Sequence, residues 1–177
     1  MSAESRAMEI IIRKAEMDDA RLVSVLGGVT FYEAYYEQDT PVDMARYVVE
    51  SFNPEVIAAE IDDPANEFYI PLLNEKAVGY AKLITGTTAE GIDDGGIELK
   101  RIYVLERVWG TGVGERLLKF CIEKAKERGF KFIWLGVWEE NARALKFYSK
   151  HGFNQVGTVT FPYGDTVGIN KVMLRMV

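Results

Sequence analysis

Apolar residues recur along the chain in two spacings, one typical of strands and one typical of helices. The strand-like runs predict seven strands, over residues 9–15, 67–73, 77–85, 97–104, 132–138, 153–161 and 167–177. The helix-like runs predict five helices, over residues 18–36, 41–52 and 53–61, from a glycine-bearing turn to Gly129, and between Asn141 and Gly152. The first helix is expected to begin at the cap residue Asp18 and has one apolar face, formed by Leu22, Val25, Leu26 and Val29.

The strand over residues 97–104 has a central place in the predicted fold. Its second half is apolar on both faces, which is typical of a strand buried inside a sheet. A strand–helix–strand unit spans residues 97–138, and such a connection joins two parallel strands. We therefore expect a flexible tail over residues 1–8 and one domain over residues 9–177, of mixed α/β class, in which helices flank a sheet.

The composition limits the classes of protein to which the chain can belong. Its 177 residues, 48% of them apolar, suffice for one domain with a substantial core. No run of about 18 apolar residues occurs, so we expect no membrane span. The lone Cys121 lies on the apolar side of a predicted helix and excludes an internal disulfide, which fits a reducing cytoplasm. A lone His151 without a Cys/His cluster predicts no catalytic metal.

The net charge of −6 is distributed unevenly between the two halves. Residues 1–88 carry 16 acidic and 7 basic side chains, whereas residues 89–177 carry 11 acidic and 14 basic ones. This asymmetry is compatible with a solvated surface. It is equally compatible with an anionic ligand on the C-terminal half and a cationic ligand drawn to the N-terminal half. Because no dense basic stripe occurs, nucleic acid is not an expected partner.

A glycine-bearing turn over residues 107–114 joins the central strand to an amphipathic helix. Backbone N–H groups that converge at a helix N-terminus bind anions such as a pyrophosphate, and Gly110 and Gly112 keep side chains out of their way. A third glycine, required for a dinucleotide-binding fingerprint, is missing before Glu115, and the Gly-Lys-Ser/Thr of a P-loop is absent. Tyr148 on the next helix can donate a proton beside the anion. The pattern predicts a group-transfer enzyme with a phosphorylated carrier; the alternative is an ordinary turn.

The motif Arg107-x-x-Gly110-x-Gly112 resembles the pyrophosphate-binding signature of the GNAT superfamily (Gcn5-related N-acetyltransferases). Residues 141–153 resemble the closing signature of that family, and residues 133–141 and 31–47 are similar to PaiA-type polyamine acetyltransferases. This resemblance spans most of the chain. It implies the GNAT fold, a mostly antiparallel sheet of six or seven strands with one parallel pair and four or five flanking helices. It also implies acetyl-CoA as donor and spermidine or spermine as acceptor.

The resemblance implies a donor site at the end of the central strand. Arg107 and Lys150 would add charge for phosphate groups, although each is also typical of a protein surface. The strand at Tyr103-Val104 should separate from the strand at Leu135-Gly136, so that its backbone can pair with the pantetheine arm of the donor. The residues assigned to donor binding are Ile102, Tyr103, Val104, Arg107, Val108, Trp109, Gly110, Thr111, Gly112, Val113, Gly114, Asn141, Tyr148 and Lys150.

Acetyl transfer requires a neutral amine that attacks the thioester. A primary amine with a pKa of about 10.4 is neutral in roughly one molecule in a few thousand near pH 7, so a base must remove its proton. Glu98 is the candidate base, with Glu139 and Glu140 as rivals; the alternative is a solvent-facing or salt-bridged Glu98. The N–H of Val104 is expected to stabilise the oxyanion. Tyr148, whose alternative role is core packing, is expected to protonate the CoA thiolate.

Aromatic and acidic residues interleave on the first helix and predict an acceptor site there. Carboxylates and aromatic faces together hold a flexible polycation by ion pairing and cation–π contact. The residues assigned to acceptor binding are Tyr32, Glu33, Tyr36, Glu98 and Trp138. The alternative is an amphipathic helix that packs its tyrosines inward and exposes its glutamates.

The sequence thus predicts a cytoplasmic enzyme that transfers an acetyl group from acetyl-CoA to a primary amine such as a polyamine, without a metal. The alternatives are a protein N-terminal or lysine acetyltransferase and a non-catalytic acyl-CoA-binding regulator. The expected partner is a small-molecule amine, with no nucleic acid and no membrane, and a homodimer is left open. Asn170 and Lys100 depart from the acidic residues usual in the PaiA-like pattern, which bears on the identity of the acceptor.

Overall fold

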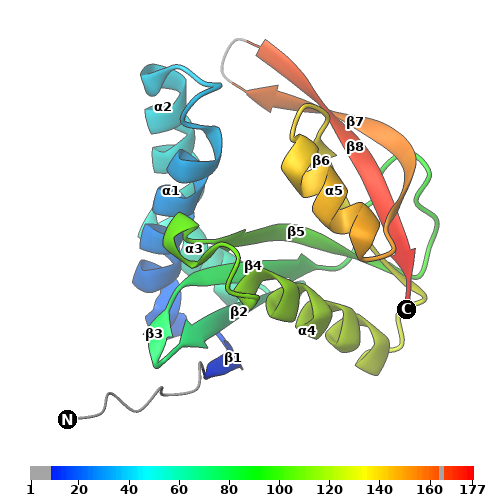
Figure 1. Cartoon of the computed structure of the whole chain (residues 1–177), viewed down its shortest axis with the longest axis horizontal. Helices are drawn as coiled ribbons and strands as arrows, with labels where there is room; N and C mark the ends of the chain where they lie inside the picture. The colour runs from blue at the N-terminus through cyan, green and yellow to red at the C-terminus, as the bar shows by residue number, and fades with distance from the viewer. Residues whose placement is uncertain (1–8, 164–165) are drawn as a thin grey trace.

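The protein is described by a computed structural model that covers residues 9–163 and 166–177 (Figure 1). Within these residues the strands form one sheet in the order β1-β2-β4-β5-β6-β8-β7, and β3 pairs with β2. The strands are β1 (Ile10–Lys14), β2 (Asn66–Leu73), β3 (Lys76–Ala77), β4 (Gly79–Ile84), β5 (Gly96–Val104), β6 (Phe132–Trp138), β7 (Asn154–Tyr163) and β8 (Thr166–Met176). The pair β5–β6 is parallel and the other pairs are antiparallel, which confirms the predicted mixed class. The sheet has eight strands because the predicted strand 77–85 is interrupted at Val78.

The helices pack on both faces of this sheet. They are α1 (Ala20–Tyr35), α2 (Pro41–Phe52), α3 (Pro54–Asp62), α4 (Val113–Glu127) and α5 (Ala142–Lys150). Residues of α4 and α5, including the fully buried Cys121, share one apolar core with the sheet. Residues of α1 and α3 form a second core, centred on Ile57 and Tyr80. The two cores lie on opposite faces because neighbouring residues of a strand, such as Tyr80 and Ala81 of β4, point in opposite directions.

The predicted apolar face of the first helix is wrong in part. Val25 and Val29 are 63% and 43% exposed, whereas Leu26 is buried as predicted and the buried side of α1 also includes Val23. Because α1 is apolar around most of its circumference, hydrophobic spacing alone cannot select the buried side. A tertiary contact selects it, because Gly27 packs closely against the ring of Phe52 on α2. A Cβ built on Gly27 would lie only 2.5 Å from that ring.

The start of the first helix also differs from the prediction. A short 3-10 turn, η1 (Met17–Asp19), precedes α1, and Asp19 rather than Asp18 organises it. The Asp19 carboxylate accepts hydrogen bonds from the Glu16 N–H at 2.8 Å and from the Arg13 guanidinium at 2.6 and 2.7 Å. The hydrogen bond with Arg13 is the main cause that lowers the pKa of Asp19. The turn is thereby tied to β1.

The described residues offer neither a membrane-spanning helix nor a cluster of metal ligands. None of the described helices is long and apolar enough to cross a membrane. Among the described residues, no group of three or more His, Cys, Asp or Glu side chains is placed to hold a metal ion.

The strands β5 and β6 stay together over a short distance only. Their parallel ladder contains three residue pairs, from Gly96–Phe132 to Glu98–Trp134. Beyond Glu98, β5 continues beside β4 and β6 continues beside β8. A register shift in the β4–β5 ladder beyond Leu99 marks a bulge, which bends and twists a strand. Figure 1 shows the part of the sheet that contains β6, β8 and β7 turned away from β4 and β5. The separation predicted near Tyr103-Val104 is therefore confirmed.

The far end of β5 is held against β4 by a close backbone contact at Gly79. A Cβ at this position would overlap the carbonyl oxygen of Tyr103 and lie 2.8 Å from Cα of Val104. We predict that Gly79→Ala lowers the free energy of unfolding by about 1–3 kcal/mol, because backbone atoms cannot move aside cheaply. In Gly168→Ala the new Cβ meets its nearest atom at 3.7 Å, so this control should change the stability by less than about 0.5 kcal/mol. Urea unfolding of both variants measures the difference, and equal stabilities would contradict the contact.

Candidate functional site

The segment between β5 and α4, residues 107–114, forms a glycine turn at the N-terminus of α4. A short 3-10 turn, η2 (Glu106–Val108), leads into Gly110 and Gly112, whose φ angles of 77° and 88° lie in the left-handed region that favours glycine. No atom lies within 4 Å of the position that a Cβ would take at either glycine, so the turn borders open space. The first N–H groups of α4 have no partners within the helix, and the helix dipole is positive at this end. The turn can therefore hold an anion with its backbone.

A cavity of about 1020 Å³ fills the wedge between the separated strands. Its walls come from β5, the glycine turn, β6, α5, α1 and the β7–β8 hairpin. The Leu105 N–H donates to the carbonyl oxygen of Val78 on β4 at 2.8 Å. Because hydrogen-bonding directions alternate along an antiparallel strand, the N–H and C=O of Val104 point the other way, toward the cavity. The C=O of Val104 accepts the indole N–H of Trp109 at 3.1 Å, and its N–H is available to a ligand.

Most residues assigned to donor binding line this cavity. They are Ile102, Tyr103, Val104, Val108, Trp109, Gly110, Gly112, Gly114, Asn141 and Tyr148. Asn141 also caps α5, because its side-chain oxygen accepts the N–H of Ala144 at 3.0 Å.

Four of the assigned donor residues lie outside the lining. Arg107 is exposed on η2. Thr111 donates its hydroxyl to the carbonyl oxygen of Val108 at 2.6 Å, and Val113 is fully buried. Their side chains point away because the turn presents its backbone, not its side chains, to the open space.

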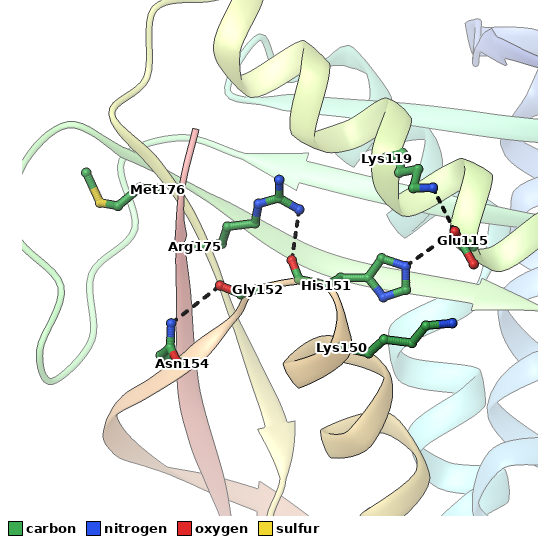
Figure 2. A pocket seen from close by; sticks show the side chains of 8 residues that line it. All are labelled: Glu115, Lys119, Lys150, His151, Gly152, Asn154, Arg175 and Met176. Carbon is green, nitrogen blue, oxygen red and sulfur yellow. Dashed lines mark hydrogen bonds and ion pairs between the residues drawn. The ribbon is translucent and has the colours of Figure 1, made fainter.

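Lys150, the fourth, lies in a separate polar hollow of about 640 Å³ beside the C-terminus of α5 (Figure 2). Figure 2 shows its side chain extended beside His151 toward Glu115, a residue that lines both the hollow and the cavity. Glu115 binds Lys119 at 2.7 Å, which is the main cause that lowers its pKa; the charges of Lys150 and His151 act in the same direction. Positive charge therefore gathers just outside the cavity.

Tyr148 lies at the boundary between the core and the cavity. Its ring packs near those of Phe153 and Phe147, with centroids 5.7 and 5.4 Å away. Tyr148 therefore has the core-packing role that was the alternative to a role as acid. Burial raises the pKa of Tyr148 above its ordinary value, which keeps the phenol protonated at neutral pH. The residue lines the cavity.

Glu98 also lines the cavity, on the last residue of β5 that pairs with β6. Its side chain is 6% exposed, and Oε1 lies 3.1 Å from Nζ of Lys100. Glu98 therefore forms the salt bridge that the alternative interpretation expected, and it lines the cavity at the same time. The rivals Glu139 and Glu140 are exposed and lie outside the cavity lining.

Of the residues assigned to acceptor binding, Glu98 and Trp138 line the cavity, whereas Tyr32, Glu33 and Tyr36 do not. Tyr32 and Tyr36 are 49% and 63% exposed on the outer side of α1. The carboxylate of Glu33 accepts the backbone N–H of Glu106 at 2.8 Å and so supports η2. The cause is that the side of α1 with Val23 and Leu26 faces the core. This orientation turns Tyr35 inward, so that Tyr35 lines the cavity in place of its neighbours.

The wall opposite the glycine turn is aromatic. Phe31 stacks on Tyr47 with ring centroids 4.4 Å apart, and Tyr35 lies 6.2 Å from Trp138. We call the rings of Phe31, Tyr35, Tyr47, Trp138 and Phe161, which all line the cavity, the aromatic wall. Of these, the sequence assigned Trp138 to acceptor binding, and Tyr35 is one of the aromatic residues that interleave with acidic ones on the first helix. Phe31 and Tyr35 stand four residues apart and so share one helix face, a signal that identifies them only once the inner face of α1 is known.

Two charged groups accompany the aromatic wall. Asp39, which follows α1, lines the cavity. Arg101 lines it as well, but its guanidinium lies 2.9 Å from Glu60, a carboxylate that also binds Lys82 at 2.9 Å. Burial raises the pKa of the neighbouring Tyr35 to about 12, so this phenol is neutral.

Comparisons with known proteins agree with this geometry. The family model described as Acetyltransferase (GNAT) family matches residues 28–153. An uncharacterized N-acetyltransferase of Lactobacillus delbrueckii subsp. lactis is 30% identical over 156 residues, which are 88% of this chain and 90% of that protein. A spermine/spermidine N(1)-acetyltransferase of Bacillus subtilis is 33% identical over 80 residues, 45% of this chain and 52% of that protein. The crystal structure of a PaiA N-acetyltransferase from Thermoplasma acidophilum in complex with coenzyme A has the same fold, with a TM-score of 0.79 and 21% identity over 96% of this chain and 100% of that one.

Proposed function

The chain belongs to the acetyltransferase (GNAT) family and is an N-acetyltransferase, and on this premise we propose that it transfers the acetyl group of acetyl-CoA to a primary amine, with a polyamine such as spermidine or spermine as the acceptor. One observation carries the proposal. A continuous cavity joins the glycine turn, the phenol of Tyr148, the carboxylate of Glu98 and the aromatic wall. Donor, acid, base and acceptor site are thus in contact with one space.

The glycine turn fits the diphosphate of acetyl-CoA. The open space at Gly110 and Gly112 admits phosphate oxygens close to the backbone, and the N-terminus of α4 favours a negative charge by roughly 0.3–1 kcal/mol. The open edge of β5 suits the amide groups of the pantetheine arm, which can pair with it as a further strand does. Bound acetyl-CoA supplies the activated thioester, and the remaining steps fall to residues of the chain.

The aromatic wall and two carboxylates support a cationic acceptor. Asp39 and Glu98 line the cavity together with the aromatic wall, and aromatic faces attract ammonium groups. The charge of Arg101 on the same wall is offset only in part by Glu60, because that carboxylate also binds Lys82. The likeness to the Bacillus subtilis spermine/spermidine N(1)-acetyltransferase, which covers part of the chain, points in the same direction.

Three groups of the chain have roles in the proposed reaction. Glu98 removes a proton from the incoming ammonium group, directly or through a water molecule. The N–H of Val104 stabilises the negative charge that develops on the attacked carbonyl oxygen. As the C–S bond breaks, Tyr148 gives its phenolic proton to the departing sulfur, and the phenolate regains a proton, directly or through water, from the nitrogen that has attacked the carbonyl carbon. The raised pKa of Tyr148 keeps that proton in place until the charge on sulfur develops.

We predict turnover of acetyl-CoA with spermidine and spermine, measured as release of free CoA with a thiol reagent. Cys121 does not interfere, because burial raises the pKa of its thiol to about 12. Simple monoamines and peptides with a free N-terminus or a lysine are compared in the same assay. If only the peptides were acetylated, the acceptor would be a protein and not a polyamine. Binding of CoA without turnover on any amine would make the protein a regulator and contradict the proposed catalysis.

We predict that Tyr148→Phe lowers kcat about 10²–10⁴-fold with little change in the Kd of CoA, because the phenyl ring keeps the packing and loses only the proton. Titration calorimetry measures the Kd separately from the rate. The matched control is Tyr69→Phe, which removes a phenol hydroxyl that binds Glu67 outside the cavity lining. An unchanged kcat in Tyr148→Phe would exclude Tyr148 as the acid.

We predict that Glu98→Gln lowers kcat/KM for the amine and makes it depend more steeply on pH. Without a base in the cavity, the reaction uses only amine that is already neutral, so its rate should rise about tenfold per pH unit below the amine pKa. Rate profiles between pH 7 and 9 measure the slope. Glu139→Gln tests the rival base. A slope that changes in Glu139→Gln and stays at the wild-type value in Glu98→Gln would transfer the role to Glu139.

A further inference from the structure

Trp109 and Arg143 face one another across the mouth of the cavity. Trp109 belongs to the glycine turn, and Arg143 is the second residue of α5. The guanidinium carbon of Arg143 lies 3.4 Å from the centroid of the Trp109 ring, a close cation–π contact. The indole N–H of Trp109 donates to the carbonyl oxygen of Val104 at 3.1 Å. The two side chains thus connect β5 and α5, the walls that the wedge separates.

Arg143 is an exposed cation without a carboxylate in ion-pair contact in the described part of the chain. It forms no ion pair with any described carboxylate, and the first turn of α5 contains no acidic residue. A positive charge at a helix N-terminus opposes the helix dipole. Burial against neighbouring groups lowers the pKa of Arg143, and the charge of Glu106 only partly counteracts this effect. Stacking on Trp109 holds the guanidinium in place but supplies no negative charge.

The cations that the sequence pointed to lie elsewhere. Arg107 is exposed on η2 outside the cavity lining, and Lys150 lies in the hollow shown in Figure 2. Arg143 lines the cavity together with Gly110 and Gly112. An anion at the glycine turn would meet the turn's backbone N–H groups on one side and the guanidinium of Arg143 on the other.

We propose that Arg143 binds the diphosphate of the acetyl donor and that Trp109 is a positioning residue that holds the guanidinium at the cavity mouth. This inference rests on the proposed function, because it assigns the charge partner of the same donor. A guanidinium forms paired, charge-assisted hydrogen bonds to phosphate oxygens. The indole ring restricts the rotamers of a long side chain, so that less freedom is lost when the donor binds.

The first test compares CoA with pantetheine, which lacks the diphosphate. Calorimetric titration of Arg143→Ala with CoA should give a Kd about 10- to 100-fold higher than that of the wild-type chain. With pantetheine the two proteins should bind equally. The matched control is Lys146→Ala, which removes one positive charge from the exposed side of the same helix, and it should leave the Kd of CoA within about twofold of wild type. Thermal unfolding verifies that each variant is folded.

The second test is a double-mutant cycle between the two side chains. Trp109→Leu should raise the Kd of CoA in the same direction as Arg143→Ala. The double variant should bind CoA no more weakly than Arg143→Ala alone, because Trp109 acts through Arg143. Trp109→Phe, which retains a ring for stacking, should recover part of the lost affinity. Additive losses in the double variant would show that Trp109 contacts the donor itself and would overturn its positioning role.

The outcomes distinguish this inference from the proposed function. A wild-type chain that does not bind CoA contradicts the proposed function. A wild-type chain that binds CoA, with an Arg143→Ala variant of equal affinity, overturns the inference and leaves the proposed function intact. An equal loss of affinity for CoA and pantetheine in Arg143→Ala also overturns it, because the effect then does not depend on the phosphates.

Discussion

The divergence of β5 from β6 after three residue pairs is the constraint on which the candidate site depends. An inner strand of a sheet normally uses its backbone groups on both sides, and here one side of β5 near Val104 faces a cavity instead. Buried backbone groups need partners, so an extended ligand with amide groups is a natural occupant of the wedge. The same divergence brings the end of β5, the glycine turn and α5 around one space. A sheet with a continuous β5–β6 ladder would have no such space.

In the proposed function, the glycine turn and the aromatic wall recognise their ligands by different physical means. At the glycine turn, recognition depends on backbone N–H groups and on the left-handed conformations of Gly110 and Gly112. At the aromatic wall, it depends on side chains from segments far apart in the chain, including Phe31 on α1 and Phe161 on β7. Backbone recognition requires few specific residues, whereas side-chain recognition changes with every substitution. The donor end is therefore determined by few residues, and the acceptor end by many.

The short helix α5 connects these two ends. It carries Asn141 as its cap, Arg143 at the cavity mouth and Tyr148 at the boundary of the core. Its C-terminus is anchored by His151, whose Nδ1 lies 2.8 Å from the carbonyl oxygen of Phe147 and whose own carbonyl oxygen accepts a hydrogen bond from Arg175 at 2.8 Å. A helix fixed at both ends holds its functional groups at constant separations. The positions of Arg143 and Tyr148 relative to each other are thus set by local structure.

The sequence by itself determined the features that depend on neighbouring residues. The period of apolar residues gave β6 at residues 132–138, Pro41 and Asn53 marked helix starts, and the spacing of Gly110 and Gly112 located the anion-binding turn. Tyr148 and Asn141 could be found for the same reason, because both stand in one local motif.

Only the tertiary structure decided which side of α1 faces the core. Apolar residues surround that helix, so the contact of Gly27 with Phe52 sets its rotation and exposes Tyr32 and Tyr36 while Tyr35 lines the cavity. The pairing of Trp109 with Arg143 was likewise invisible in the sequence, because 33 residues and one strand separate them and the wedge alone brings them together. Local spacing is fixed by covalent geometry, whereas contacts between distant segments depend on packing that no single segment encodes.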